Sequence, residues 1–264
     1  MEGKAGKGLS IRYKLLLSYI LVIIIPVVIG AYLPFIYTRD EIIKETDQSL
    51  SFSLDQMVES MKYKMAKYIR ISNKLVNDYE LMNYLADDYT GREKDAHYAA
   101  YAIYNKKLSD EIQNNYEEIL NIRIYKKNQT LPADGGYLID EDTVKDEYWY
   151  ESAYKNKGVA FWKRGTYKTF EEKDINTISI INGIRQPNSV GLLEIELKTE
   201  DFFNVIRKFK YKQDCVIGII DETGKTVTQN GNELYDELLP KLENRIAELK
   251  NDSFTQKIDN DECL

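Results

Sequence analysis

The sequence predicts an α+β fold that follows a membrane-spanning helix. Three features lead to this prediction: an uncharged apolar run, a segment of helical periodicity without proline or glycine, and several short alternating segments separated by turn residues. We expect antiparallel strands with helices set to one side. The expected divisions are a cytoplasmic tail, a transmembrane helix, a long signalling helix, a complete sheet module and an incomplete one, at residues 1–14, 15–37, 38–89, 90–200 and 201–264.

The apolar run Leu15–Tyr37 is long enough to cross a membrane. As a helix it would extend about 35 Å, against a hydrocarbon core of roughly 30 Å. Four cations and one acid precede it, whereas Arg39 is followed by acidic residues. The positive-inside bias therefore places residues 1–14 in the cytoplasm and residues 38–264 outside a cell membrane. The alternative is a cleaved secretory signal with its cleavage site at Val28-Ile29-Gly30, but the apolar run continues past that site.

Composition limits the possible functions. Without the four tail cations and Glu2, the 36 basic and 43 acidic residues fall to 32 and 42, a formal charge of −10, which argues against a nucleic-acid partner. The only histidine, His97, lies in a segment rich in tyrosine and alanine, and the sequence contains no phosphate-binding glycine loop or metal-spaced His/Cys cluster. We therefore predict no catalytic residues, no metal site and no cofactor.

The segment Asp40–Asp88 repeats apolar residues at helical spacing. Ser72 fills the one polar position of this seam, and one extra step forms a stutter that locally unwinds a heptad repeat. The segment can be half of a dimeric coiled coil or a backbone helix along which two modules lie. Met and Tyr are weaker coiled-coil material than Leu and Ile, which favours the backbone helix, with dimerisation near the membrane. The seam positions are Leu50, Leu54, Met57, Met61, Met65, Tyr68, Leu75, Tyr79 and Met82.

The remaining chain alternates between helical and strand patterns. In the strand Ile119–Lys126, alternation puts Ile122 and Ile124 on one face and Arg123 and Tyr125 on the other. Thr199 is the expected cap of a helix, and the pattern then begins again without finishing. Helices are expected at Ala96–Tyr116, Glu200–Lys208 and Asn232–Leu249, and a short helix or half-ordered loop at Glu141–Asn156. Further strands are expected at Val159–Arg164, Thr177–Arg185, Val190–Leu197, Cys215–Ile220, Lys225–Thr228 and Phe254–Ile258.

Two aromatic clusters form the candidate binding site. Tyr148-Trp149-Tyr150 is followed by Phe161-Trp162-Lys163-Arg164, so both tryptophans of the protein lie within 14 residues. Aromatic faces can form the apolar walls of a small-ligand pocket, while hydroxyl, indole N–H and guanidinium groups orient the ligand. The alternative is that these side chains form a local core.

Several segments together resemble a known family. They are SLDQMVES and ISNKLVNDYELMNYL in the long helix, EDTVKDEYWYESA with a following FW, and GLLEIEL before a helix. In this order they resemble the extracytoplasmic sensor of double Cache (dCache) receptors, especially bacterial YesM-like sensor histidine kinases, over about residues 11–227. The resemblance implies two PAS-like modules along the long helix. The membrane-distal module, residues 90–200, would hold the ligand, and the membrane-proximal module, residues 201–264, is incomplete here.

One subgroup of this family binds amino acids through an Arg-x-Trp-Tyr-x-x-Ala pattern. Trp149, Tyr150 and Ala153 match it, but Glu147 stands where an arginine would grip the ligand carboxylate. Arg185-Gln186 likewise replaces an aspartate often found near the strand turn. These departures favour a cationic, sugar-like or peptide ligand, or none. The candidate ligand-binding residues are Tyr125, Glu147, Trp149, Tyr150, Trp162 and Arg164.

The resemblance implies a function in signalling. The chain would be the non-catalytic, ligand-sensing part of a two-component sensor histidine kinase, acting as a homodimer with the membrane and a small extracellular ligand as partners. The alternatives are a membrane-anchored scaffold or adhesion protein, or the input domain of a chemoreceptor or diguanylate cyclase. Such receptors continue into a second span and an output domain, so we expect the chain ending at Leu264 to be a truncated product or a fragment.

Overall fold

The computed structural model describes residues 10–155, 159–168, 173–185, 189–208, 217–220, 226–229, 256–258 and 261–263. Contacts divide the chain into two compact units, Met1–Gln56 and Met57–Leu264. The helices are α1 (Ile11–Val76), α2 (Tyr79–Ala86), α3 (Glu93–Ala102), the π-helix η1 (Ile103–Leu108), α4 (Ser109–Asn114), the 3-10 helix η2 (Glu141–Val144), α5 (Tyr150–Lys155), α6 (Thr199–Phe202) and α7 (Asn204–Arg207). The strands are β1 (Ile119–Lys126), β2 (Leu138–Asp140), β3 (Phe161–Lys168), β4 (Asp174–Arg185), β5 (Ser189–Lys198), β6 (Gly218–Ile220), β7 (Thr226–Gln229), β8 (Gln256–Ile258) and β9 (Asp261–Cys263).

Apart from Ser10, the described part of the first unit belongs to helix α1. Every side chain of residues 15–37 is exposed, and α1 contains an 18-residue window with a mean hydropathy of 2.6. Length and composition therefore suffice to cross a membrane. Pro26 and Pro34 lie inside this helix, where a lipid environment tolerates them better than water does.

The long helix is shorter than the sequence predicts. It ends at Val76, and Asn77 and Asp78 separate it from α2. The Asp78 carboxylate accepts a hydrogen bond of 2.9 Å from the Leu81 N–H and so caps the new helix. The expectation of an unbroken helix to Asp88 is therefore wrong, because an aspartate cap starts a second helix without any glycine or proline.

A five-stranded sheet forms the centre of the second unit, in the order β2-β1-β5-β4-β3. The pairs β1–β5, β5–β4 and β4–β3 are antiparallel, but β2 pairs in parallel with β1. The sheet is thus mixed and not wholly antiparallel as expected. The turn before β2 is held by Asp134, whose Oδ1 accepts hydrogen bonds from the backbone N–H groups of Gly136, Tyr137 and Leu138.

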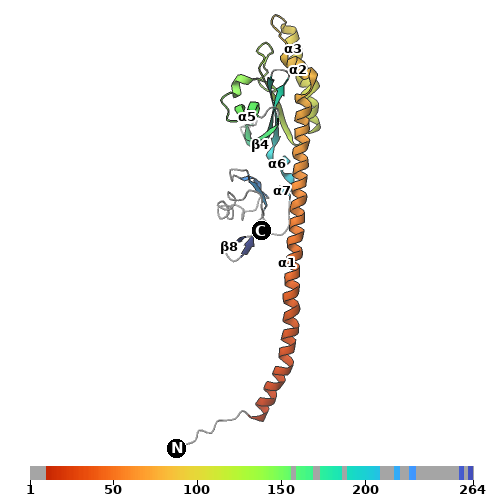
Figure 1. Ribbon diagram of the computed structural model, residues 1–264, viewed down its shortest axis with the longest axis vertical. Helices are drawn as coiled ribbons and strands as arrows, with labels where there is room; N and C mark the ends of the chain where they lie inside the picture. The colour runs from red at the N-terminus through yellow and green to blue at the C-terminus, as the bar shows by residue number, and fades with distance from the viewer. Residues whose placement is uncertain are drawn as a thin grey trace, which may run out of the picture. The chain divides into compact units, whose positions relative to one another are not determined.

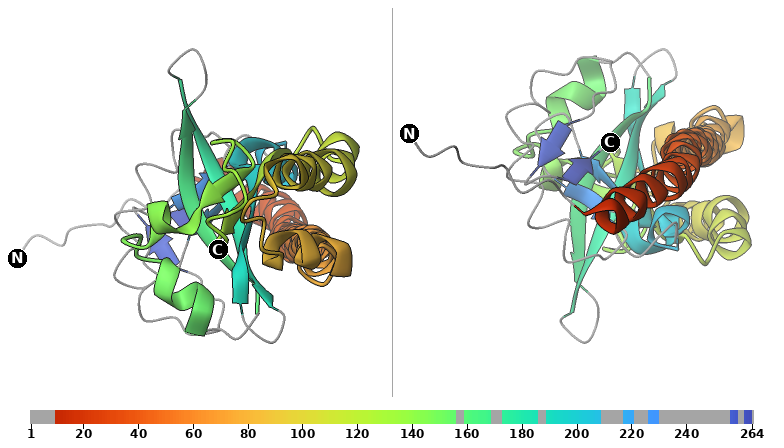
Figure 2. Two further views of the ribbon diagram at one scale, coloured as in Figure 1. Left: turned by 90° about the horizontal axis from the view of Figure 1, so that it is seen from above. Right: turned by 90° about the horizontal axis from the view of Figure 1, so that it is seen from below.

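The sheet is a layer between two unequal coverings (Figures 1 and 2). Residues 57–76 of α1, together with α2, α3 and η1, pack on one face in a large apolar cluster that includes Ile124, Ile195 and Phe202. The other face is covered by η2 and α5 in a small cluster around Trp149. The α+β prediction with a long N-terminal helix is confirmed, but helices cover both faces and not one.

Several predicted elements differ in their bounds. The segment Glu141–Asn156, predicted as a short helix or a half-ordered loop, contains two short helices, η2 and α5. The predicted helix Glu200–Lys208 is likewise divided into α6 and α7. Thr199 is the first residue of α6, and no side-chain cap precedes that helix. The strands β6, β7 and β8 overlap the predicted strands Cys215–Ile220, Lys225–Thr228 and Phe254–Ile258, whereas β9, which pairs with β8, was not predicted. The predicted helix Asn232–Leu249 lies outside the described residues.

Candidate functional site

The face of the sheet under α5 carries charged side chains in an apolar setting. Strand β5 alternates: Leu193, Ile195 and Leu197 belong to the large cluster on the α1 face, so Glu194 and Glu196 point to the α5 face. Both glutamates are buried, with 1 % and 4 % of their surface exposed. Burial of a charge is costly unless partners compensate it, so the partners of these glutamates define the chemistry of this face.

Glu194 is held from both sides of β5, by the adjacent strand β1 and, across β4, by strand β3. The Tyr125 hydroxyl of β1 donates a hydrogen bond to its Oε2, and the Lys163 Nζ of β3 lies 2.9 Å from its Oε1. Glu196 lies 3.0 Å from the guanidinium of Arg123 and accepts a hydrogen bond of 3.2 Å from the Thr177 hydroxyl. Arg123 also approaches Glu194 at 3.7 Å.

The two glutamates have opposite pKa shifts. Burial raises the pKa of Glu194, but the ammonium of Lys163 and the hydroxyl of Tyr125 outweigh it, so the net pKa is lowered. Burial raises the pKa of Glu196 more strongly than Arg123 lowers it, and the Glu194 carboxylate raises it further. Burial and the charge of Glu194 raise the pKa of the Tyr125 hydroxyl, which therefore remains a proton donor.

Trp149 covers this charged network. Its ring lies 5.8 Å from that of Tyr125 between centroids, and the Lys163 ammonium lies 4.6 Å from the Trp149 centroid. Only 3 % of Trp149 is exposed. Next to it, the Tyr150 hydroxyl donates a 2.7 Å hydrogen bond to the buried Glu141, which also accepts one from Tyr154. Aromatic rings and hydroxyls thus close the site from the α5 side.

The structure brings together only some of the residues singled out in the sequence. Tyr125, Trp149 and Tyr150 belong to the α5 side of the sheet. Trp162 lies on the opposite face, where its ring is 5.6 Å from Phe202. Arg164, two residues further along β3, lines a separate pocket of about 330 Å³ with polar residues of β4 and Thr199. The two tryptophans therefore do not line one site.

Glu147 is exposed in the turn between η2 and α5. Its backbone N–H donates to the Val144 carbonyl and its carbonyl accepts from the Tyr150 N–H, so the backbone at this position shapes the start of α5. The side chain is not part of the buried network given above.

Lys163, Glu194 and Glu196 were missed by the sequence reasoning. A signal for them exists, because the strand GLLEIEL places two glutamates at alternating positions of an otherwise apolar run, and both must face the same side. Lys163 was not among the predicted site residues, although it is adjacent to Trp162 in the sequence. Adjacent strand residues point to opposite faces, so only one of these two can face Trp149.

The sheet also makes polar contacts with α1. Asn182 of β4, 1 % exposed, donates hydrogen bonds of 3.0 Å to the Ser72 hydroxyl and to the Asn73 side-chain oxygen. Lys64 lies 2.6 Å from Glu118 and donates a 3.0 Å hydrogen bond to the Phe202 carbonyl of α6. The α1 helix is thus bonded both to the central sheet and to the segment that leaves it.

A long N-terminal helix packed on one face of a five-stranded mixed sheet, with a short helical cover on the other, is the architecture of Cache or PAS-like extracellular sensor domains. Solved structures show this likeness. The ligand-binding domain of the Campylobacter jejuni chemoreceptor Tlp3 in complex with L-valine has a TM-score of 0.52 and 17% identity, covering 78% of this chain and 83% of that chain. The same domain with L-norvaline has a TM-score of 0.50 and 16% identity, covering 82% and 84%.

A further solved structure is the extracellular domain of a protein described as a histidine kinase, soHK1S-Z6. Its TM-score of 0.33 and identity of 12%, over 71% of this chain and 83% of that chain, are too low to support an argument. No protein-family profile and no curated protein sequence matches the chain. The likeness to the Tlp3 ligand-binding domain is therefore one of fold.

Proposed function

We propose that this chain is the ligand-sensing and signal-transmitting part of a membrane sensor, with the α5 face of the sheet as its binding site. The supporting observation is the buried charged network of Tyr125, Lys163 and Glu194 beneath Trp149. Such a network offers a donor, an acceptor and an aromatic wall at one place, which a small polar ligand can engage by replacing internal partners. The chemoreceptor domains of similar fold are described as complexes with small amino acids.

The cover of this site is the element best suited to move. Only a few buried side chains hold η2 and α5 to the sheet, whereas a large cluster holds α1 to the other face. Elements with few buried contacts open at lower free energy. We infer that a ligand enters by displacing α5 with Trp149, and that its contacts with Glu194 bias the position of β5.

A bias in β5 has a direct route to α1. Glu194 faces the site, and its neighbours Leu193 and Ile195 pack in the cluster that contains α1. Asn182 on the adjacent strand is hydrogen bonded to α1 at Ser72. A ligand that prefers one arrangement of the sheet would therefore shift α1, which runs without a break into the span.

We further propose a cell-membrane location with the N-terminus in the cytoplasm, and a homodimer. Val58 and Tyr63 of α1 are 51% and 67% exposed, and a partner helix can cover them. The output is proposed to be a two-component histidine kinase of the YesM-like, double Cache type. A chemoreceptor output is equally compatible with the fold, so the coding sequence downstream of Leu264 is the observation that separates the two.

The two tryptophans provide the binding test. In the full chain reconstituted in nanodiscs, Trp162→Phe leaves only Trp149 as a reporter at the site, and Trp149→Phe leaves only Trp162 on the other face. A panel of amino acids, polyamines, sugars and short peptides is screened by thermal shift and by tryptophan fluorescence emission. A ligand of the proposed site changes the Trp149 emission, and Lys163→Met weakens its binding about tenfold. The proposal fails if no compound in the panel changes either signal.

A scaffold without a ligand is the second candidate. It is favoured by the 3 % exposure of Trp149 and by the internal partners of each charge in the network. Its distinguishing result is a Trp149→Phe variant that loses stability while no panel compound stabilises the unchanged chain.

A further inference from the structure

We propose that the helical layer carries a second binding site, for a neutral saccharide, between α2 and α3. An open pocket of about 520 Å³ lies there, within the range of roughly 300–1,000 Å³ typical of small-molecule sites. Its lining includes Tyr84, Asp87, Tyr89, Arg92, Asp95 and Tyr98. This pocket is separated from the α5 face by the sheet, so the inference does not rest on the proposed function.

Aromatic rings form the apolar part of the pocket. Tyr84 comes from α2 and Tyr98, 55% exposed, from α3, so rings from two helices line the same space. Tyr89 is only 5% exposed, and its hydroxyl donates a 3.0 Å hydrogen bond to the Tyr84 carbonyl, which fixes the ring. The negative face of an aromatic ring attracts the weakly positive C–H groups of a sugar ring.

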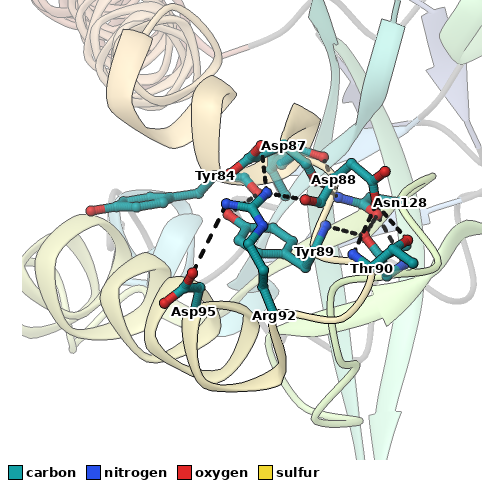
Figure 3. Close-up of polar contacts among 10 residues, drawn as sticks. Tyr84, Asp87, Asp88, Tyr89, Thr90, Arg92, Asp95 and Asn128 are labelled. Atoms are coloured by element: carbon teal, nitrogen blue, oxygen red, sulfur yellow. Dashed lines mark hydrogen bonds and ion pairs between the residues drawn. The ribbon is translucent and has the colours of Figure 1, made fainter.

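A row of planar polar groups lies beside the rings (Figure 3). The Arg92 guanidinium lies between the Asp87 and Asp95 side chains, donating a 3.0 Å hydrogen bond to Asp87 and lying 3.9 Å from Asp95. Acceptor, donor and acceptor thus follow one another. A hydroxyl both donates and accepts, so neighbouring hydroxyls of one sugar can satisfy such an alternating row.

The charges at the pocket nearly cancel. Among the lining residues, Asp87 and Asp95 face the one cation Arg92. The Lys106 ammonium, 5.4 Å from the Tyr98 centroid and 3.0 Å from its hydroxyl, adds a second positive charge beside the pocket. Because neither sign of charge dominates, an ionic ligand gains little here. A ligand recognised by ring faces and hydroxyl hydrogen bonds gains most, which favours a neutral saccharide.

The loop that carries the row is held in place. The Asp88 carboxylate accepts hydrogen bonds from the Thr90 N–H and hydroxyl, at 2.9 and 2.7 Å. The Asn128 side chain donates to the carbonyls of Leu85 and Asp87, at 3.1 and 2.7 Å, and joins this loop to the segment after β1 (Figure 3). A preformed site loses less entropy when it binds a ligand.

Binding is tested on the full chain in nanodiscs by saturation-transfer NMR and calorimetric titration. The probes are cellotriose, xylotriose, maltotriose and chitotriose, together with the matching soluble polymers. Tyr98→Ala and Asp95→Asn are the pocket variants, and both residues are exposed enough to leave folding intact. Tyr116→Ala is the matched control, since Tyr116 is 68% exposed and does not line the pocket.

At least one saccharide should bind the unchanged chain, and Tyr98→Ala should weaken that binding about tenfold, with Asp95→Asn weakening it less. Tyr116→Ala and Trp149→Phe should leave it unchanged. Tighter binding of a polymer than of its trisaccharide identifies a polysaccharide as the source, and the reverse identifies a free oligosaccharide. The proposal is overturned if no probe binds, or if Trp149→Phe abolishes binding while Tyr98→Ala does not.

Discussion

The two faces of the central sheet are built from the same strands but differ in chemistry. On the α1 face, β5 contributes Leu193, Ile195 and Leu197 to one large apolar cluster. On the α5 face, the alternate residues Glu194 and Glu196 are buried with cationic partners. Apolar contact holds α1 to the sheet over many side chains, whereas paired charges leave the α5 face dependent on a few specific partners.

The two faces are therefore expected to respond differently to a displacement or to the loss of one side chain. An apolar interface is tolerant of small displacements, because no single contact dominates it. A buried ion pair is intolerant, because loss of one partner strands the other. Under the proposed function, the α5 face would detect the ligand and the α1 face would pass on the displacement that results.

The largest loss of stability is expected where the backbones of β5 and β1 are in close contact, because both faces depend on this strand pair. A Cβ at Gly191 would lie 2.4 Å from the Tyr125 carbonyl oxygen, so Gly191→Ala must separate β5 from β1. We expect a loss of about 3 kcal/mol or more and parallel changes in the emission of Trp149 and Trp162, measured in thermal unfolding. Gly136→Ala is the control, since its nearest contact would be 3.8 Å. An unchanged Trp162 signal would show that the faces are independent.

On the charged face, Glu194→Gln should cost about 3 kcal/mol, because Lys163 then remains partly buried without its counter-ion. Glu196→Gln should cost clearly less, since burial raises the pKa of Glu196 and Arg123 would keep Glu194 as a partner at 3.7 Å. Thermal unfolding of the two variants side by side measures the difference. Equal losses would mean that both glutamates act as simple structural ion pairs.

On the apolar face, Asn182→Ala should cost about 2 kcal/mol, because it leaves the buried Ser72 hydroxyl without this donor. The double variant with Ser72→Ala should recover part of the loss, since the stranded group is removed as well. The measurement is a double-mutant cycle on thermal stability. Strict additivity would contradict a direct contact between β4 and α1.

Protonation should separate the two glutamates without any change of sequence. The pKa of Glu194 is lowered in the folded state, so its stabilisation is present at neutral pH and is lost as pH falls below the ordinary value near 4.5. The pKa of Glu196 is raised, so its protonation, which takes place above that ordinary value, favours the folded state as pH falls. The stability gap between the unchanged chain and Glu194→Gln should therefore shrink between neutral and acid pH. A constant gap would contradict the lowered pKa.

Much of the fold follows from local patterns. The strand Ile119–Lys126 was predicted with its observed bounds, because apolar and polar residues alternate over Asn121–Ile124 and charged residues bound it. The break at Asn77-Asp78 was missed because the apolar seam continues across it, although an aspartate three residues before Leu81 is a helix-start signal. The strand β2 was missed because three residues are too few for a periodicity, and its parallel partner is set by tertiary contacts.

The candidate site shows a different limit. Trp149 and Tyr150 could be singled out by residue type, but their side of the sheet depends on where α5 folds back. Trp162 and Arg164 were grouped with them by closeness in sequence, yet strand parity puts Trp162 beside Phe202 on the other face. Within β3 and β5, the sequence alone indicates which residues share a face of the sheet, because side chains alternate along a strand. The pairing that brings Lys163 to Glu194 across β4 was not, because it requires the register of three strands.

Strand β3 ends the sheet on the side opposite β2, and in the described part of the chain no further strand pairs with its outer edge. An open edge invites another copy of the chain to add to the sheet and begin an aggregate. Here the edge strand carries adjacent cations, Lys163 and Arg164, one toward each face. Two such edges brought together would place like charges side by side. The lysine that pairs with Glu194 within the module thus also helps to keep separate molecules apart.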